Sequence, residues 1–333
     1  MDNRKLTIDD IARELNISKT TVSRAISGKG RIGQETRDKV LKYIKENNYR
    51  PSAIAKGLAQ SKTFNISLVM PGDSSVVDLP FYHEFLWGIS NAASKSDYDV
   101  IISMVNDNDI AQLVRVIENN KVDGVVLGQT LEDDIAEKYL KEKDIPFVTA
   151  GSSLDPSVLQ VDNDHRSACR ELTSTLFRKN LKKVALIGSD VKTIVSKNRL
   201  AGFKDACAEH NATIDEELIF LNKNSVSKVE LAVEEILKKG VACIICMDDY
   251  ICECVLDKLE KEDVKIPEDI RVASFYDSIL LEDSKAVSVS LKFNVAELAS
   301  ACCNTLLARI DKQPVPMKTL LGYEVVIREA TQG

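Results

Sequence analysis

The stretch from Thr7 to Ile32, TIDDIARELNISKTTVSRAISGKGRI, predicts two short helices joined by a tight turn. Thr7 can cap the first helix, with Asp10 as its partner in a capping box. The apolar residues that follow recur at the spacing of one helix face. Asn16 can end this helix in a left-handed conformation, and Ser18 can cap the next helix. The stretch therefore predicts a helical hairpin with a sharp corner.

The second predicted helix buries a narrow apolar face and exposes only hydroxyl and cationic side chains. Val22, Ala25 and Ile26 recur at the spacing of a buried face. The side chains expected to face outward are Lys19, Thr20, Ser23, Arg24 and Ser27. Such a helix suits a DNA major groove, because Arg can make two hydrogen bonds to guanine and hydroxyls can reach phosphates or base edges. On these residues alone, an ordinary hairpin with a solvated outer face is the alternative.

Charge is distributed unevenly along the 333 residues. Residues 1–62 hold 14 Lys and Arg against 7 Asp and Glu, a net charge of +7. The rest of the chain holds 30 Lys and Arg against 44 Asp and Glu, a net charge of −14. A small basic region joined to a large acidic one is typical of a nucleic-acid-binding domain carried by another module. DNA would repel the acidic part, which we expect to bind something else.

Composition argues against a membrane protein, a secreted protein and a metal centre. No apolar run is long enough to cross a bilayer, and we expect no targeting segment before the first helix. The eight cysteines lack the spacing of a disulfide framework, so we expect a cytoplasmic protein with reduced thiols. Cys243 and Cys246 lie in the apolar run VACIICM, which predicts a buried strand whose residues three apart face opposite sides. We therefore expect neither a metal nor a cofactor.

A third helix and a conditional segment complete the basic region. Gly33 stands at the expected N-cap of the third helix, and Asn47-Asn48 ends it. Tyr49-Arg50-Pro51 then interrupts the chain. The sequence SAIAKGLAQS at 52–61 is too short to form a stable helix alone, so we expect it to fold only when something supports it. A flexible linker is the alternative.

From Phe64 onward, apolar strands alternate with amphipathic helices, and the alternation restarts after Asp155-Pro156. Runs such as VALIG and ACIICM are apolar throughout, as expected for parallel strands covered on both faces. The pattern predicts an α/β fold with two doubly wound lobes and a ligand site in the cleft between them. The late segments 287–291, 295–310 and 323–327 predict that the chain crosses between the lobes more than once.

Sequence motifs favour a regulator over an enzyme. The chain contains no GxGxxG, no phosphate-binding P-loop and no GxSxG, and its three histidines are scattered. A two-lobed enzyme is therefore the weaker hypothesis. A sugar-binding transport protein would carry a signal peptide in place of the basic region.

Several motifs along the whole chain resemble the LacI/GalR family of bacterial transcription regulators. They are TVSR at 21–24, ETR at 35–37, YRP at 49–51, PFY at 80–82, VDND at 161–164, RLAGF at 199–203 and IPEDI at 266–270. Within that family, VSKNRLAGF and SVSLKFNVAELA are most similar to maltose-operon regulators. The resemblance implies a three-helix helix-turn-helix head at 1–50, a hinge helix at 51–62 and a periplasmic-binding-protein-like domain at 63–333. The N-lobe would comprise about 63–161 and 293–320, and the C-lobe about 162–292 and 321–331.

The resemblance also implies a homodimer on double-stranded operator DNA. Carried over by position, the residues that contact bases would be Lys19, Thr20 and Arg24. Those that contact phosphates would be Ser18, Thr21, Ser23, Ser27, Arg31, Thr36 and Tyr49, which set register rather than sequence preference. In the hinge segment, Ala55 and Leu58 would reach the DNA, with Leu58 wedged into a minor-groove base step.

The implied effector is a small sugar bound between the lobes, and the implied function is repression of a carbohydrate-utilisation operon. The matching positions are Asp73, Phe81, Gln129, Asp164, Arg199, Asp248, Tyr276 and Asp277. Two positions depart from the family pattern: Asp248-Asp249 replaces a usual Asn-Asp, and Tyr276 replaces a usual Asp or Asn. Tyr276 would add a second stacking face or close the pocket. Maltose, a maltodextrin or another oligosaccharide is the expected effector. The alternatives are a phosphorylated sugar or a protein corepressor, and both induction and corepression stay open.

Overall fold

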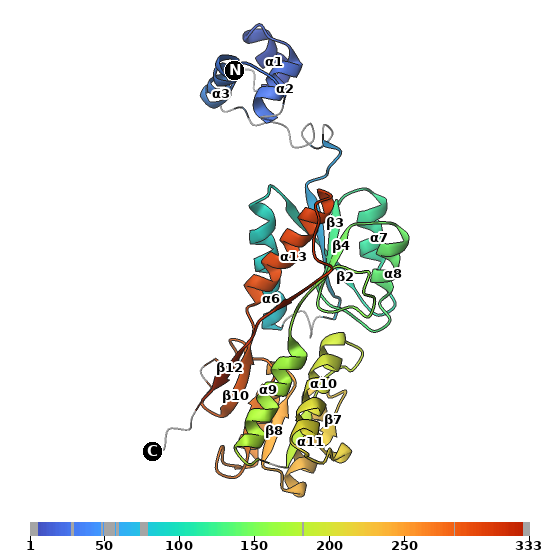
Figure 1. Cartoon of the computed structure of the whole chain (residues 1–333), viewed down its shortest axis with the longest axis vertical. Helices are drawn as coiled ribbons and strands as arrows, with labels where there is room; N and C mark the ends of the chain where they lie inside the picture. The colour runs from blue at the N-terminus through green and yellow to red at the C-terminus, as the bar shows by residue number, and fades with distance from the viewer. Residues whose placement is uncertain are drawn as a thin grey trace. The chain divides into compact units, whose positions relative to one another are not determined.

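The computed structural model describes residues 6–27, 30–47, 49, 57, 60–73, 79–181, 183–282 and 284–328. The chain divides into an N-terminal unit, Met1–Thr63, and a larger unit, Phe64–Gly333. Figure 1 shows the helical first unit and the two sheets of the second.

The N-terminal unit consists of α1 (Ile8–Glu14), α2 (Lys19–Ser27) and α3 (Gln34–Glu46). Its core includes the fully buried side chains of Ile11, Val22 and Val40, one from each helix. Thr7 and Asp10 form the predicted capping box. Asn16 adopts the predicted left-handed conformation with φ of 53°. The Thr21 backbone N–H donates to the Ser18 hydroxyl at 3.1 Å, so Ser18 caps α2 as predicted.

The first lobe of the larger unit is a six-stranded sheet in the order β11-β5-β4-β3-β1-β2, with every neighbouring pair parallel. Helices α6 and α13 cover one face and α7 and α8 cover the other (Figure 1). Its elements are β1 (Asn65–Pro71), α6 (Pro80–Ser94), β2 (Asp99–Val105), α7 (Ala111–Glu118), β3 (Gly124–Leu127), α8 (Ile135–Glu142), β4 (Phe147–Ala150), β5 (Gln160–Asn163), α13 (Val295–Ile310) and β11 (Lys318–Leu321).

The second lobe has the strand order β12-β10-β9-β8-β6-β7, in which β12 alone pairs antiparallel. Helices α9 and α10 contribute to one core and α11 and α12 to the other. Its elements are α9 (His165–Arg178), β6 (Val184–Ile187), α10 (Ile194–Glu209), the 3-10 helix η1 (Glu216–Leu218), β7 (Ile219–Phe220), α11 (Val226–Lys239), β8 (Cys243–Cys246), α12 (Asp249–Lys261), β9 (Arg271–Ser274), β10 (Val287–Lys292) and β12 (Glu324–Ile327).

Between the described strands the chain crosses from lobe to lobe three times, after β5, after β10 and after β11. The prediction of more than one crossing is confirmed, as is the doubly wound α/β class. The sequence did not predict β5 or β11, which pair with each other at the sheet edge from distant parts of the chain. Helix α10 begins at Ile194, a turn before the RLAGF motif, because the Thr193 hydroxyl caps it by accepting from the Ser196 N–H.

Close backbone approach explains one motif. Within RLAGF at 199–203, Gly202 faces α9, and a Cβ atom there would lie 2.3 Å from the Arg166 carbonyl oxygen. Any larger residue would push α10 away from α9, because a contact that short is repulsive. Gly202 therefore lets the two helices pack closely and places the rest of α10, including Arg199, against the C-lobe sheet.

The cysteines behave as small apolar residues. All eight are free and buried. Cys243 belongs to the core on one face of its sheet and Cys246 to the core on the other, as the strand period predicts. Among the described residues no group of His, Cys, Asp and Glu could hold a metal ion, and no helix is long and apolar enough to cross a membrane.

Candidate functional site

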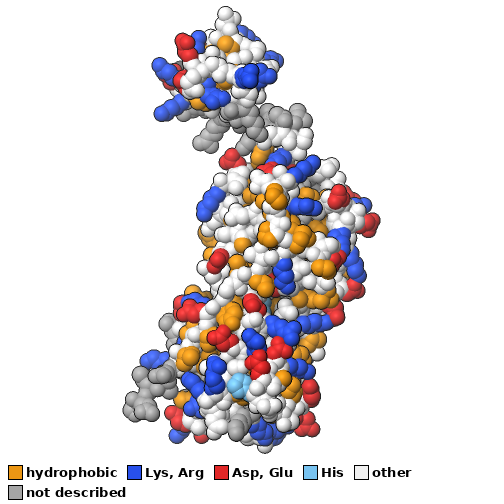
Figure 2. Space-filling model, in the orientation of Figure 1, with side chains coloured by type: hydrophobic (Ala, Val, Ile, Leu, Met, Phe, Trp, Pro, Cys, Tyr) orange, Lys and Arg blue, Asp and Glu red, His pale blue; other side chains and the backbone are white. Residues whose placement is uncertain are grey.

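The outward face of α2 presents polar side chains to solvent. Thr20, Ser23 and Arg24 are exposed. Lys19 is also exposed, and its ammonium lies 2.6 Å from the Asp9 carboxylate of α1. Because exposed ion pairs contribute little stability, a phosphate or a base edge can compete with Asp9 for Lys19. Figure 2 shows Lys and Arg side chains over the visible face of this unit.

The other residues predicted to contact DNA differ in how accessible they are. The Thr21 hydroxyl lies 2.9 Å from that of Ser18, so these two share a hydrogen bond at the start of α2. Arg31 is exposed, whereas Thr36 and Tyr49 are half-buried. Burial raises the pKa of the Tyr49 hydroxyl above its ordinary value, so the group is a hydrogen-bond donor that a phosphate could accept from. The Ser27 side chain, Ala55 and Leu58 lie outside the described residues.

A cavity of about 160 Å³ opens where the N-lobe strands end. Asp73 follows β1, Asn106 and Asp107 follow β2, and Gln129 follows β3, as expected for a ligand site at the carboxyl ends of parallel strands. Asp190, which follows β6 of the C-lobe, also lines the cavity. The cavity therefore lies between the lobes and collects carboxylate and amide groups.

The two lobes are joined beside this cavity by backbone and ionic contacts. The Glu132 N–H donates to the Lys192 carbonyl at 3.0 Å, and the Ile194 N–H donates to the Thr130 carbonyl at 3.1 Å. The Lys192 ammonium also crosses to Asp107 at 2.7 Å. The structure thus holds the lobes together along the start of α10.

A second group of candidate residues surrounds Tyr276. The residue is 7% exposed, and its ring makes an edge-to-face contact with Phe81 of the N-lobe, with the ring centroids 6.4 Å apart. It also stacks on Phe293 at 6.3 Å, and the Arg199 guanidinium carbon lies 5.9 Å from its centre. Tyr276 therefore packs between the lobes, where it occupies aromatic surface on which a sugar would otherwise stack.

Arg199 is the positive charge at the centre of an acidic group. Its guanidinium donates to the Met247 carbonyl. Burial raises the pKa values of Asp248 and Asp249, and the charge of Arg199 partly offsets both shifts. Burial also lowers the pKa of His165, and Arg199 lowers it further. One Arg thus faces two carboxylates, so this group has no surplus positive charge for an anionic ligand.

Individual carboxylates in this region have structural partners. Asp248 caps α12 by accepting from the Ile251 N–H at 2.9 Å, and it also accepts from Ser189 at 3.2 Å. Asp164 caps α9 by accepting from the Ser167 N–H at 3.1 Å. One oxygen of Asp277 binds Arg328 and Ser290, so the structure does not bring this predicted effector residue together with the others.

Sequence reasoning missed several residues of the cleft. They are Asn106, Asp107, Asp190, Asp249 and Phe293. The first three follow strands β2 and β6, so the rule that ligands gather at strand carboxyl ends would have found them. Asp249 has a buried carboxylate oxygen, Oδ2, for which the described residues offer no hydrogen-bond partner. Asp249 could be identified as a cleft residue only from the structure, because the sequence does not show which of the neighbouring residues Asp248 and Asp249 leaves a carboxylate oxygen without a partner.

Comparison with known proteins identifies the chain. Residues 63–288 match the family of periplasmic binding proteins and sugar binding domains of the LacI family, and residues 7–52 match the lacI family of bacterial regulatory proteins. The chain belongs to the LacI family of transcriptional regulators. The prediction of a regulator rather than an enzyme is confirmed by this membership.

Relatives match over most of their length. The chain is 32% identical to the HTH-type transcriptional regulator MalR of Streptococcus pneumoniae, over 96% of this chain and 99% of that protein. It is also 32% identical to catabolite control protein A of Staphylococcus xylosus, over 83% and 84%. The fold matches the lac repressor dimer bound to operator, with a TM-score of 0.79, 19% identity and coverage of 99% and 100%.

Proposed function

We propose that this LacI-family regulator acts in the cytoplasm as a homodimeric repressor of a carbohydrate-utilisation operon, with an uncharged sugar as effector. The cavity between the lobes carries this proposal, because its polar lining consists largely of carboxylates and amides. Carboxylates accept hydrogen bonds from sugar hydroxyls, and amides both donate to them and accept from them.

The charge of the cleft favours a neutral sugar over a phosphorylated one. Asp73, Asp107 and Asp190 line the cavity, and Lys192 is paired with Asp107. The positive charge of Arg199 acts on the buried carboxyl groups of Asp248 and Asp249. A phosphate dianion placed there would meet carboxylates at close range in a partly desolvated site, which is unfavourable. Maltose is the first candidate, because parts of the sequence are most similar to maltose-operon regulators and MalR is a relative.

On the DNA side, we propose that Lys19, Thr20 and Arg24 contact bases in the major groove. The phosphate contacts would come from Ser18, Thr21, Ser23, Ser27, Arg31, Thr36 and Tyr49, and the hinge contacts from Ala55 and Leu58. By linkage, a sugar that changes operator affinity by some factor must have its own affinity changed by operator by the same factor.

A thermal-shift screen of the full chain tests the effector. Maltose, maltotriose, sucrose and glucose 6-phosphate are compared, since a ligand that binds only the folded state raises the melting temperature. We expect a rise with a neutral oligosaccharide and none with glucose 6-phosphate. A rise with the phosphosugar alone would refute the charge argument, and a uniformly negative screen would favour a protein corepressor.

Operator binding is tested with DNA selected from a random pool by the full-length protein. The selected sequences are expected to be near-palindromic, because a symmetric dimer reads two half-sites. Adding the sugar identified in the screen is expected to change the affinity for them. Selection of non-palindromic DNA would contradict the dimeric mode of binding.

A further inference from the structure

In the loop at 275–282, which follows β9, neighbouring side chains pack on opposite faces of the backbone. Tyr276 packs among aromatic rings between the lobes, whereas Asp277 binds Arg328 at the end of β12. We propose that Arg328 is a positioning residue: by holding Asp277, it fixes Tyr276 on the effector side of the loop. This inference rests on the proposed function, because it assigns the loop to the effector site.

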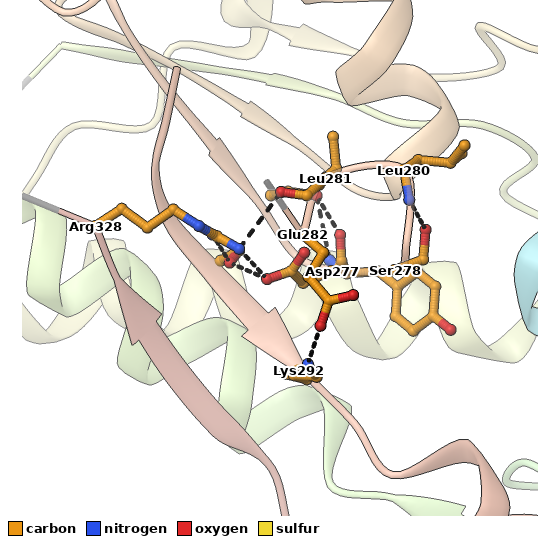
Figure 3. A network of polar contacts seen from close by, with 10 residues as sticks. Asp277, Ser278, Leu280, Leu281, Glu282, Lys292 and Arg328 are labelled. Atoms are coloured by element: carbon orange, nitrogen blue, oxygen red, sulfur yellow. Dashed lines mark hydrogen bonds and ion pairs between the residues drawn. The ribbon is translucent and has the colours of Figure 1, made fainter. Parts of the chain in front are cut away.

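The contacts around Arg328 form a closed network (Figure 3). Its Nη2 donates to Asp277 Oδ2 at 2.7 Å, and its Nη1 donates to Ser290 Oγ at 2.6 Å. Ser290 in turn donates to the same Asp277 oxygen at 2.8 Å. The Asp277 side chain is 4% exposed and that of Arg328 is 19% exposed. A carboxylate this buried needs its charge partner, because solvation by water is largely lost.

The backbone of the loop explains why neighbouring side chains diverge. The Asp277 N–H donates to the Leu291 carbonyl at 2.8 Å, so the pairing between β9 and β10 continues past the end of β9. Side chains of successive residues on such extended backbone point to opposite faces. Asp277 therefore faces Arg328, while Tyr276 faces Phe81.

The position of Tyr276 matters for effector binding whether its ring stacks on the sugar or closes the site. If the ring stacks on the sugar, it must stay parallel to the ligand. If the ring closes the site, a sugar must displace it from between Phe81 and Phe293. In both cases, loss of Arg328 leaves Asp277 as a buried anion, and the loop has to move so that water can reach the carboxylate. That movement carries Tyr276 with it.

Full-length protein labelled with 3-fluorotyrosine tests the inference by fluorine NMR. The chain has eight tyrosines, and Y276F assigns the signal of interest. We expect Arg328→Gln to shift the Tyr276 signal towards that of solvent-exposed tyrosine and to change the affinity for maltose, measured by calorimetry, roughly tenfold or more. Binding weakens if the ring stacks on the sugar and tightens if the ring closes the site. Arg328→Lys keeps the positive charge, so it should bring the Tyr276 signal and maltose binding part of the way back to those of the parent protein.

Lys292→Gln is the matched control. Lys292 binds Glu282 of the same loop at 3.2 Å, but both side chains are more than half exposed (51% and 59%). Removing this pair exposes no buried charge, so we expect the Tyr276 signal and maltose binding to stay as in the parent protein.

Asp277→Ala serves as the second variant where Arg328→Gln fails to fold. It removes the side chain that Arg328 and Ser290 hold, so the released loop should shift the Tyr276 signal in the same way. A lower melting temperature with an unchanged Tyr276 signal in these variants would overturn the inference, because Arg328 would then only stabilise the lobe. Failure of the parent protein to bind maltose would refute that effector, while the fluorine signal would still decide the role of Arg328.

Discussion

Replacing Arg199 by Met should destabilise the larger unit by an amount that grows with pH. Met keeps much of the side-chain volume but loses the charge, the hydrogen bond to the Met247 carbonyl and the cation–π contact with Tyr276. Hydrogen bonds from charged donors are worth about 1.5–3 kcal/mol. A cation over an aromatic ring contributes about 0.5–2 kcal/mol. We therefore expect a loss of roughly 2–5 kcal/mol near pH 5.

The pH dependence follows from the groups that face Arg199. The pKa values of Asp248 and Asp249 are raised by burial and partly restored by Arg199. A carboxyl whose pKa is raised in the folded state contributes stability below its unfolded pKa and loses it as pH rises through its folded pKa. Without Arg199 those pKa values rise further, and each pKa unit is worth about 1.4 kcal/mol. The cost of the substitution therefore increases towards pH 8.

His165 also makes the destabilisation by Arg199→Met larger at high pH than at low pH. Its pKa is lowered by burial and then by Arg199, so it loses stability as pH falls below its ordinary value. Removing Arg199 relieves part of that loss, which makes the substitution less costly in acid. The carboxylates and the histidine together predict a difference of about 1 kcal/mol or more between pH 5 and pH 8.

Urea unfolding followed by circular dichroism at pH 5 and pH 8 measures this difference. Arg170→Met is the control, because Arg170 pairs with Glu209 at 3.1 Å through side chains that are about half exposed. The control should change stability little at either pH. If the cost of Arg199→Met were equal at the two pH values, or larger at pH 5, Arg199 would not be the charge that stabilises these carboxylates.

Three further predictions concern other parts of the chain. Arg24→Ala should weaken binding to selected DNA by about 1–3 kcal/mol in a fluorescence anisotropy titration, and an unchanged sequence preference would remove Arg24 from base contacts. Gly202→Ala should lower stability by about 1–3 kcal/mol, because its Cβ would lie 2.3 Å from the Arg166 carbonyl oxygen; an unaltered melting temperature would contradict that clash. A double-mutant cycle between Asp107 and Lys192, measured as the melting temperature, should show a coupling that disappears at high salt. A coupling that survives high salt would mean that the pair is shielded from solvent.

Local sequence signals were sufficient for most secondary structure. Helix caps, left-handed turns and apolar periodicity depend on neighbours a few residues apart, so Thr7, Asn16 and Ser18 could be assigned from the sequence. The same holds for β8, which lies within the predicted run VACIICM, and for α13, whose limits match the predicted segment 295–310. The charge split between the two regions is likewise a property of the sequence alone.

Pairings between distant segments could not be predicted in this way. Strands β5 and β11 are four residues each, and their register depends on contact across more than 150 residues of chain. The sequence QVDN has little apolar character by itself, and it becomes buried because β11 and α13 return to the N-lobe. Only the fold brings these segments together.

The sequence by itself determined the family, the two-lobed α/β class and the residue types of the cleft, because motifs and periodicity are local in the chain. The tertiary structure decided which of those residues face one another. It turned Asp277 towards Arg328 and Tyr276 towards Phe81, although the two residues are adjacent, since extended backbone alternates its side chains. It also placed Asp190 of one lobe in the cavity of the other. Such choices depend on packing across the lobes, which sequence spacing does not encode.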